Sequence, residues 1–113
     1  MPHIDDKGRR IMSVIRLLHT EGCHAYHEAF DEIEKALKEK GLPVRFEAVL
    51  ITSEKEASEH KFFGSPAVQV NGQDVDPKAK MVTKYGASSC RPYFWKGKSY
   101  DYPPKEMILE SLK

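Results

Sequence analysis

The spacing of apolar and polar residues changes along the chain, and successive segments have the spacing typical of a strand, then of a helix. The stretch Ile11–Leu18 is strongly apolar, which is typical of a strand buried in the centre of a sheet. From Ala25 onward, apolar residues recur every three or four positions and charged residues fill the positions between them, which predicts a helix with one buried face. Gly41 predicts the end of this helix, and Pro43 prevents the helix from starting again.

The pattern then predicts a second strand and a short helix. Val44–Ile51 alternates between apolar and polar positions, as a strand does. A strand, a helix and a strand joined in this order form a right-handed crossover, so we expect the two strands to be parallel. Ser53 and Glu56 have the spacing of a capping box, which predicts a helix that ends near His60.

A hairpin and a last helix complete the pattern. Ala67–Val70 and Gln73–Val75 flank Asn71-Gly72, a dipeptide that is typical of two-residue hairpin turns. Pro103-Pro104 precedes the apolar positions of Lys105–Leu112, and this order predicts a helix that begins after the prolines.

The stretch from Asp76 to Tyr102 is too long for a structureless loop in a small domain. We therefore expect an extra hairpin over Tyr93–Tyr100, with its turn around Lys96-Gly97-Lys98. The predicted class is α/β, with a mixed central sheet, the order β-α-β-α-β-β-α and an insertion before the last helix. We assign residues 1–10 to a flexible N-terminal segment and residues 11–113 to one domain.

Composition and charge restrict the classes of partner. The 113 residues include 18 Lys and Arg and 17 Asp and Glu, a net charge of +1. Basic and acidic residues are interspersed, so we expect no nucleic-acid partner. No apolar stretch is long enough for a membrane span, so we expect no membrane partner and a cytoplasmic protein. Phosphate-loop, nucleotide-binding and serine-nucleophile motifs are absent, and we expect no cofactor. An exposed edge strand would allow a weak dimer, so we expect a monomer or weak dimer.

Cys23 is the main candidate for chemistry, because it stands between the first predicted strand and the first predicted helix. The N-terminal end of a helix favours the thiolate over the thiol. Thiolates attack disulfides and bind soft metals. In the cytoplasm most thiols stay reduced, so the two cysteines of this chain are expected to be reactive, metal-binding or incidental and not a permanent structural bridge.

Three segments carry a resemblance to a known family: Gly22-Cys23, residues 63–77 around Ser65-Pro66, and residues 89–93, which begin Ser89-Cys90. In this order they resemble a family of small bacterial and archaeal thioredoxin-like proteins, some of which are associated with organomercury-resistance proteins. The resemblance extends from about Ile11 to Leu112. It implies a thioredoxin-like three-layer sandwich and a cis Ser65-Pro66 peptide bond beside Cys23.

The same resemblance implies a substrate groove formed by Gly22, Tyr26, Ser65 and Pro66. Tyr26 stands where a Cys-x-x-Cys motif would have its second cysteine. Cys23 is therefore expected to act as a single attacking thiol. It would be resolved by glutathione or by another cysteine. In a thioredoxin-like topology the chain that leaves the hairpin returns towards Cys23, which makes Cys90 the internal candidate.

Three functions stay open from the sequence. The leading prediction is a thiol–disulfide redox protein, which as an enzyme would be a thiol–disulfide oxidoreductase. Its expected partner is a protein or a low-molecular-weight thiol or disulfide. The second is a protein that binds or transfers a soft, mercury-like metal through Cys23 and Cys90, with His24 or His27 nearby. The third is a non-catalytic binding module on a thioredoxin-like scaffold.

Overall fold

The computed structural model describes residues 3–4, 10–11, 13–41, 44–87 and 90–112. The elements in chain order are β1 (His3–Ile4), β2 (Arg10–Ile11), β3 (Ser13–His19), α1 (Tyr26–Lys40), β4 (Val44–Leu50), α2 (Glu54–Glu59), β5 (Ala67–Val70), β6 (Gln73–Asp74), the 3₁₀ helix η1 (Pro77–Met81), β7 (Tyr93–Trp95), β8 (Lys98–Tyr100) and α3 (Lys105–Ser111). From β3 to α3 this confirms the predicted order of strands and helices, including the extra hairpin β7–β8.

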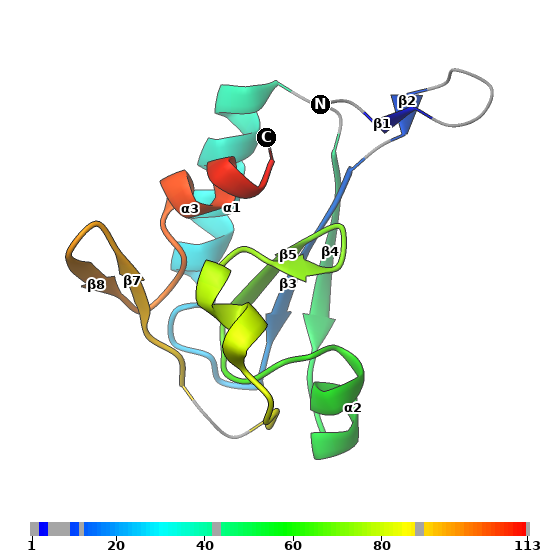
Figure 1. Cartoon of the computed structure of the whole chain (residues 1–113), viewed down its shortest axis with the longest axis vertical. Helices are drawn as coiled ribbons and strands as arrows, with labels where there is room; N and C mark the ends of the chain where they lie inside the picture. The colour runs from blue at the N-terminus through cyan, green and yellow to red at the C-terminus, as the bar shows by residue number, and fades with distance from the viewer. Residues whose placement is uncertain (1–2, 5–9, 12, 42–43, 88–89, 113) are drawn as a thin grey trace.

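The four main strands form one mixed sheet in the order β4-β3-β5-β6 (Figure 1). Strand β3 is parallel to β4, as the crossover predicts, with Ile15 beside Phe46. On its other side β3 is antiparallel to β5, where Ile15 lies beside Val70, and β5 is antiparallel to β6. Strand β3 is therefore central and buried, which accounts for its nearly continuous apolar sequence.

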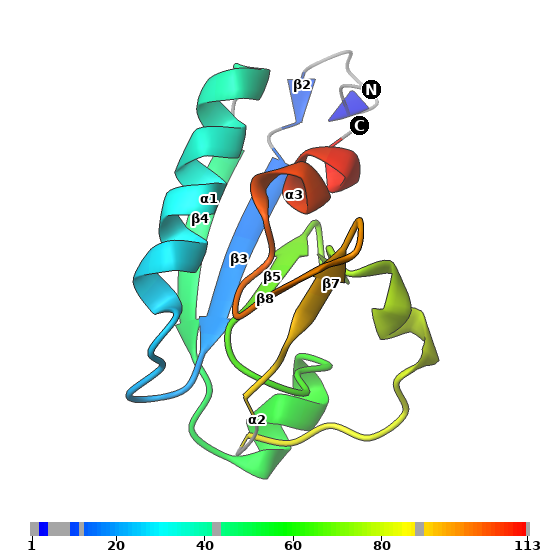
Figure 2. The ribbon, with the colours of Figure 1, turned by 90° about the vertical axis from the view of Figure 1, so that its left-hand side faces the viewer.

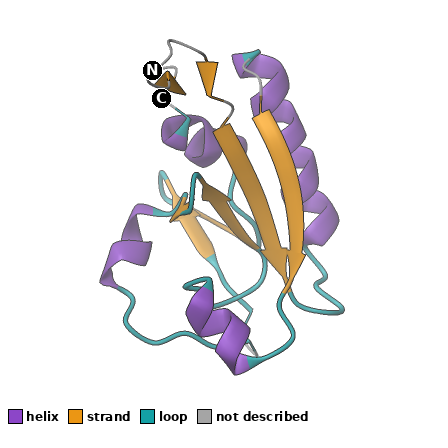
Figure 3. Cartoon of the chain, turned by 90° about the vertical axis from the view of Figure 1, so that its right-hand side faces the viewer, coloured by secondary structure: helices purple, strands orange, loops and turns teal. Residues whose placement is uncertain are grey.

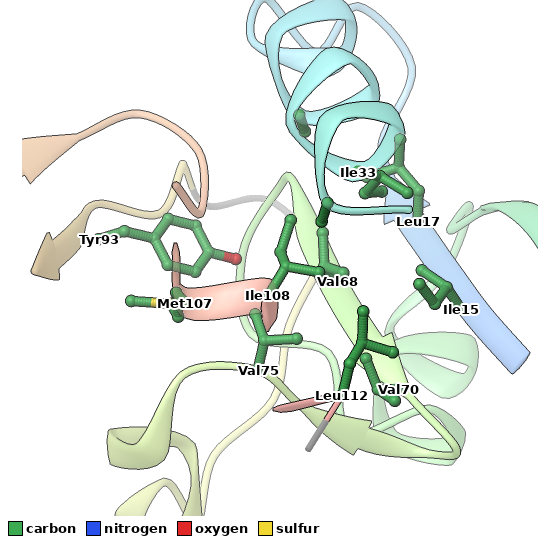
Figure 4. Packing of buried hydrophobic residues seen from close by; sticks show 12 residues of the cluster. Ile15, Leu17, Ile33, Val68, Val70, Val75, Tyr93, Met107, Ile108 and Leu112 are labelled. Atoms are coloured by element: carbon green, nitrogen blue, oxygen red, sulfur yellow. The ribbon is translucent and has the colours of Figure 1, made fainter. Parts of the chain in front are cut away.

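Helices α1 and α3 pack together on one face of the sheet (Figure 2). Ile15 and Leu17 of β3 point to this side, where they join the main core (Figure 4). Leu18 points to the other face, because successive side chains of a strand alternate. There it packs with Ala57 of α2 and with Phe62, and Figure 3 shows α2 on the side of the sheet opposite α1. Helix α2 thus covers the carboxyl end of β3 on this face, while Arg16 and Glu47 farther along it stay partly exposed.

The predicted helix ends agree with the structure. The N–H of Gly41 donates to the carbonyl of Leu37 at the end of α1. Pro43 lies outside the described residues. Ser53 accepts a hydrogen bond from the N–H of Glu56 and caps α2. The Glu56 carboxylate accepts hydrogen bonds from Thr52, and these hold the pKa of Glu56 below its usual value.

The inserted stretch contains one element that the sequence pattern did not predict. The 3₁₀ helix η1 follows Asp76, whose side chain accepts a hydrogen bond from the N–H of Lys78. Asp76-Pro77 is a typical start for such a helix, with a capping acid followed by proline. The remainder of the insertion leads to the β7–β8 hairpin.

At the N-terminus, β1 pairs with β2, and β3 begins at Ser13, two residues later than the predicted strand. Of the predicted flexible segment, residues 1–2 and 5–9 lie outside the described residues. Among the helices that the structure describes, none has the length and apolar character needed to cross a membrane.

Candidate functional site

A pocket of about 310 Å³ opens at the carboxyl end of β3, next to the start of α1. Residues from three separate parts of the sequence line it: Thr20, Glu21, Gly22, Cys23, His24, Ser65, Ala87 and Cys90. The pocket therefore contains both cysteines of the chain. It confirms the expectation that the chain leaving the β5–β6 hairpin returns near Cys23.

Cys23 lies in the turn that connects β3 to α1. Its N–H donates to the carbonyl of Thr20, and its carbonyl accepts from the N–H of Tyr26, the first residue of α1. Gly22 has φ +75°, a conformation that residues with a side chain rarely adopt, so glycine at this position permits the turn. Cys23 is thus placed at the N-terminal end of α1 and is partly exposed.

Ser65 lines the same pocket and stands two residues before the start of β5. Its side-chain oxygen accepts a hydrogen bond of 3.2 Å from the N–H of Thr20, which ties the pocket wall to the end of β3. The Ser65-Pro66 peptide bond is cis, as the family resemblance implies. The side chain of Pro66 is fully buried and is not among the residues that line the pocket.

Cys90 reaches the pocket through backbone pairing with Ser65. The two residues form an isolated parallel β-bridge, so the main chain at Cys90 occupies the strand edge of Ser65. The Cys90 side chain is exposed, and both cysteines are free thiols in this structure. Ser89 lies outside the described residues. The backbone holds Cys90 in place, while its thiol stays accessible.

Arg91 anchors the segment that carries Cys90. Its guanidinium makes two hydrogen bonds of 2.7 Å to the Asp74 carboxylate on β6 and lies 3.6 Å from Asp76. The group is stacked between the rings of Phe63 and Tyr93, with centroids at 3.9 and 4.4 Å. Only 3% of the Arg91 side chain is exposed, so this is a buried ion pair.

Sequence reasoning missed this ion pair. Burial by itself would lower the pKa of the Arg91 guanidinium, but the hydrogen bonds to Asp74 and the charge of Asp76 outweigh it, and the pKa is raised. The one signal in the sequence is the acidic pair Asp74 and Asp76 beside apolar Val75 at the end of a hairpin, which is a reason to look for a buried cation.

Tyr93 belongs to the main core (Figure 4). Its hydroxyl donates a hydrogen bond to the carbonyl of Pro66. Burial raises the pKa of Tyr93 well above its usual value; Arg91 acts in the opposite direction, and the acidic groups of Asp74, Asp76 and Cys23 add to the rise. The phenol therefore stays neutral and serves as a fixed donor to the loop that carries Ser65.

A family profile described as a domain of unknown function, DUF2703, matches residues 16–112, which include both cysteines, Ser65 and Arg91. The chain belongs to the DUF2703 family. No curated protein and no solved structure matched it.

The other predicted site residues of this DUF2703 domain lie around the pocket in different ways. Tyr26 packs its ring against His19, with centroids 4.6 Å apart, and is not among the lining residues. His24 lines the pocket and its Nε2 is 3.8 Å from the Asp101 carboxylate. The His27 ring contacts that of Tyr26. In the described parts of the chain, no three His, Cys, Asp or Glu side chains gather as a metal site.

Replacing Tyr93 with phenylalanine tests the hydrogen bond that its hydroxyl donates to the Pro66 carbonyl. We expect the free energy of unfolding at neutral pH to fall by about 1–2 kcal/mol, because the Pro66 carbonyl loses its buried partner. The raised pKa of Tyr93 means that wild-type stability is complete below about pH 10 and falls as the pH rises beyond it. Urea unfolding at neutral and alkaline pH should show that the free energy of unfolding falls less at alkaline pH in the variant than in the wild type. Identical pH profiles would contradict this interpretation.

Proposed function

We propose that this chain is a thioredoxin-like thiol–disulfide exchange protein in which Cys23 attacks and Cys90 resolves. The observation that carries the proposal is that two cysteines far apart in the sequence line one pocket. The sheet order β4-β3-β5-β6, with β5 antiparallel to its neighbours and α1 and α3 together on one face, supports the thioredoxin-like interpretation of the fold.

The reaction needs only these two thiols and a disulfide substrate. The Cys23 thiolate attacks one substrate sulfur, the substrate S–S bond breaks, and the other sulfur leaves as a thiolate. The Cys90 thiolate then attacks the Cys23 sulfur, an internal disulfide forms, and the second substrate thiolate leaves. Two electrons pass from the cysteines to the substrate. A protein thiol or a low-molecular-weight thiol returns them by the reverse exchange.

The surroundings of the cysteines suit this division of roles. Cys23 lies at the N-terminal end of a 15-residue helix, where unpaired backbone N–H groups favour a negative charge. Cys90 has an exposed side chain on a fixed backbone and lines the same pocket, so its thiol is available to a sulfur attached to Cys23.

Oxidation of the reduced chain with glutathione disulfide tests the proposal. We expect mass spectrometry to find an internal Cys23–Cys90 bridge in the wild type. The Cys90→Ser variant should instead accumulate glutathione on Cys23, and in the Cys23→Ser variant Cys90 should take up glutathione more slowly than Cys23 does. If Cys23 forms no adduct and the wild type forms no internal bridge, the exchange mechanism is wrong, and the non-catalytic binding module becomes the better interpretation.

Soft-metal binding is the second candidate, and the paired thiols in one pocket are the observation that favours it. Thiolates select soft ions such as mercury(II), and two of them suffice for a two-coordinate complex. Titration of the reduced chain with mercury(II) should then show one ion bound per chain. Replacing either cysteine with serine should weaken binding strongly. A variant that binds mercury(II) as tightly as the wild type would contradict a two-thiol site.

A further inference from the structure

The strand edge beside the pocket is already occupied by the chain itself. Extended polypeptides commonly bind next to a site by adding a strand to a free edge, through backbone hydrogen bonds. Ser65 lies at such a position, because it lines the pocket and directly precedes Pro66 and β5. Its edge is paired with Cys90. The Ser65 hydroxyl is also engaged, since it accepts from the N–H of Thr20.

The segment that occupies this edge is firmly held. A Cβ atom at Gly64 would lie 2.6 Å from the Cβ of Arg91, so the segments that carry Gly64 and Arg91 can approach this closely only because position 64 is glycine. The buried Arg91–Asp74 ion pair holds the next residue of the same segment. An incoming strand would have to break this ion pair and expose two buried charges in order to displace Cys90.

The space that stays open between the thiols is small. The pocket volume of about 310 Å³ lies at the lower limit of those that hold small ligands. Its lining supplies the two thiols together with short side chains and the polar groups of Glu21 and His24. A compact disulfide fits this space, whereas an extended chain finds no free backbone partner at Ser65.

We propose that the pocket takes low-molecular-weight disulfides and rejects extended polypeptides as substrates. This specificity rests on the proposed exchange at Cys23. The Cys23 thiolate attacks one sulfur of the small disulfide, a mixed disulfide forms on Cys23, and the other half leaves as a thiolate.

The test uses the full-length Cys90→Ser chain, so that only Cys23 reacts while the backbone at position 90 is unchanged. One probe is bis(2-hydroxyethyl) disulfide, and the other is an unstructured peptide whose cysteine carries a mercaptoethanol disulfide. The rate of adduct formation is measured by mass spectrometry. It is then divided by the rate at which N-acetylcysteine amide reacts with the same probe. The matched control is the same chain unfolded in urea, where the pocket and the Ser65 edge are lost.

In the folded chain we expect the normalised rate with the small probe to exceed that with the peptide by about tenfold, equivalent to about 1.4 kcal/mol. The unfolded chain should show no such preference. Similar rates with both probes, or a faster reaction with the peptide, would overturn the proposed specificity and leave the exchange function intact. A folded chain that reacts with neither probe, although the unfolded chain reacts with both, would overturn the exchange function and the specificity with it.

Discussion

Replacing Arg91 with methionine is expected to lower the free energy of unfolding by about 3–5 kcal/mol. Methionine fills a similar space between the rings of Phe63 and Tyr93 but carries no charge. Asp74, with a side chain only 8% exposed, then keeps a buried carboxylate without its cationic partner. Removing one member of a buried pair is costly for this reason. Urea denaturation at neutral pH measures the loss.

Arg45 offers a matched control for this substitution. Its Nε lies 3.2 Å from the Glu47 carboxylate, but 67% of its side chain is exposed. Exposed ion pairs contribute little, so Arg45→Met should change the stability only slightly. The double variant Arg91→Met, Asp74→Asn should regain part of the loss, because it removes the unpaired charge. If Arg91→Met costs no more than Arg45→Met, the buried pair does not anchor the Cys90 segment.

Replacing Gly64 with alanine is expected to lower the free energy of unfolding by about 2–4 kcal/mol. The added Cβ would stand 2.6 Å from the Cβ of Arg91, which is too close for either atom to remain in place. The segment that bears Cys90 must move away from Ser65. Under the proposed function, the internal disulfide should also form more slowly than in the wild type.

Gly97→Ala is the control for backbone strain, which both substitutions cause because Gly64 has φ +158° and Gly97 also has a positive φ. Gly97 in the β7–β8 turn has φ +80°, and a Cβ at this position would meet no atom within 4 Å. Its substitution therefore costs only backbone strain. Chemical denaturation of the two variants should show a clearly larger loss for Gly64→Ala. Equal losses would mean that contact with Arg91 is not the reason for glycine at position 64.

Local sequence patterns were sufficient to predict most of the fold. Apolar periodicity predicts β3 and α1 because both bury one continuous set of side chains. Turn residues such as Asn71-Gly72 predict hairpins because they adopt positive φ, which is observed at both positions. These signals act over a few residues, and a single sequence displays them directly.

The candidate site could be predicted only in part, because its contacts join distant segments. The resemblance brought Cys23, Ser65 and Cys90 together, and the structure places all three around one pocket. The buried Arg91–Asp74 pair escaped prediction, since an arginine is normally exposed and nothing local indicates its partner. Pairing of Cys90 with Ser65 uses backbone atoms only, so the residue types at these positions do not indicate it.

Position 90 is fixed by its backbone and not by its side chain, so the reactive group there does not contribute to the packing of the fold. The bridge to Ser65 uses main-chain atoms, and the side chain at position 90 is exposed and takes no part in either core cluster. Substitution there changes the reactive group but not the packing. The scaffold can accordingly exchange a thiol for an imidazole or a hydroxyl at this position, so new reactivity can be installed opposite Cys23 with little loss of folding free energy.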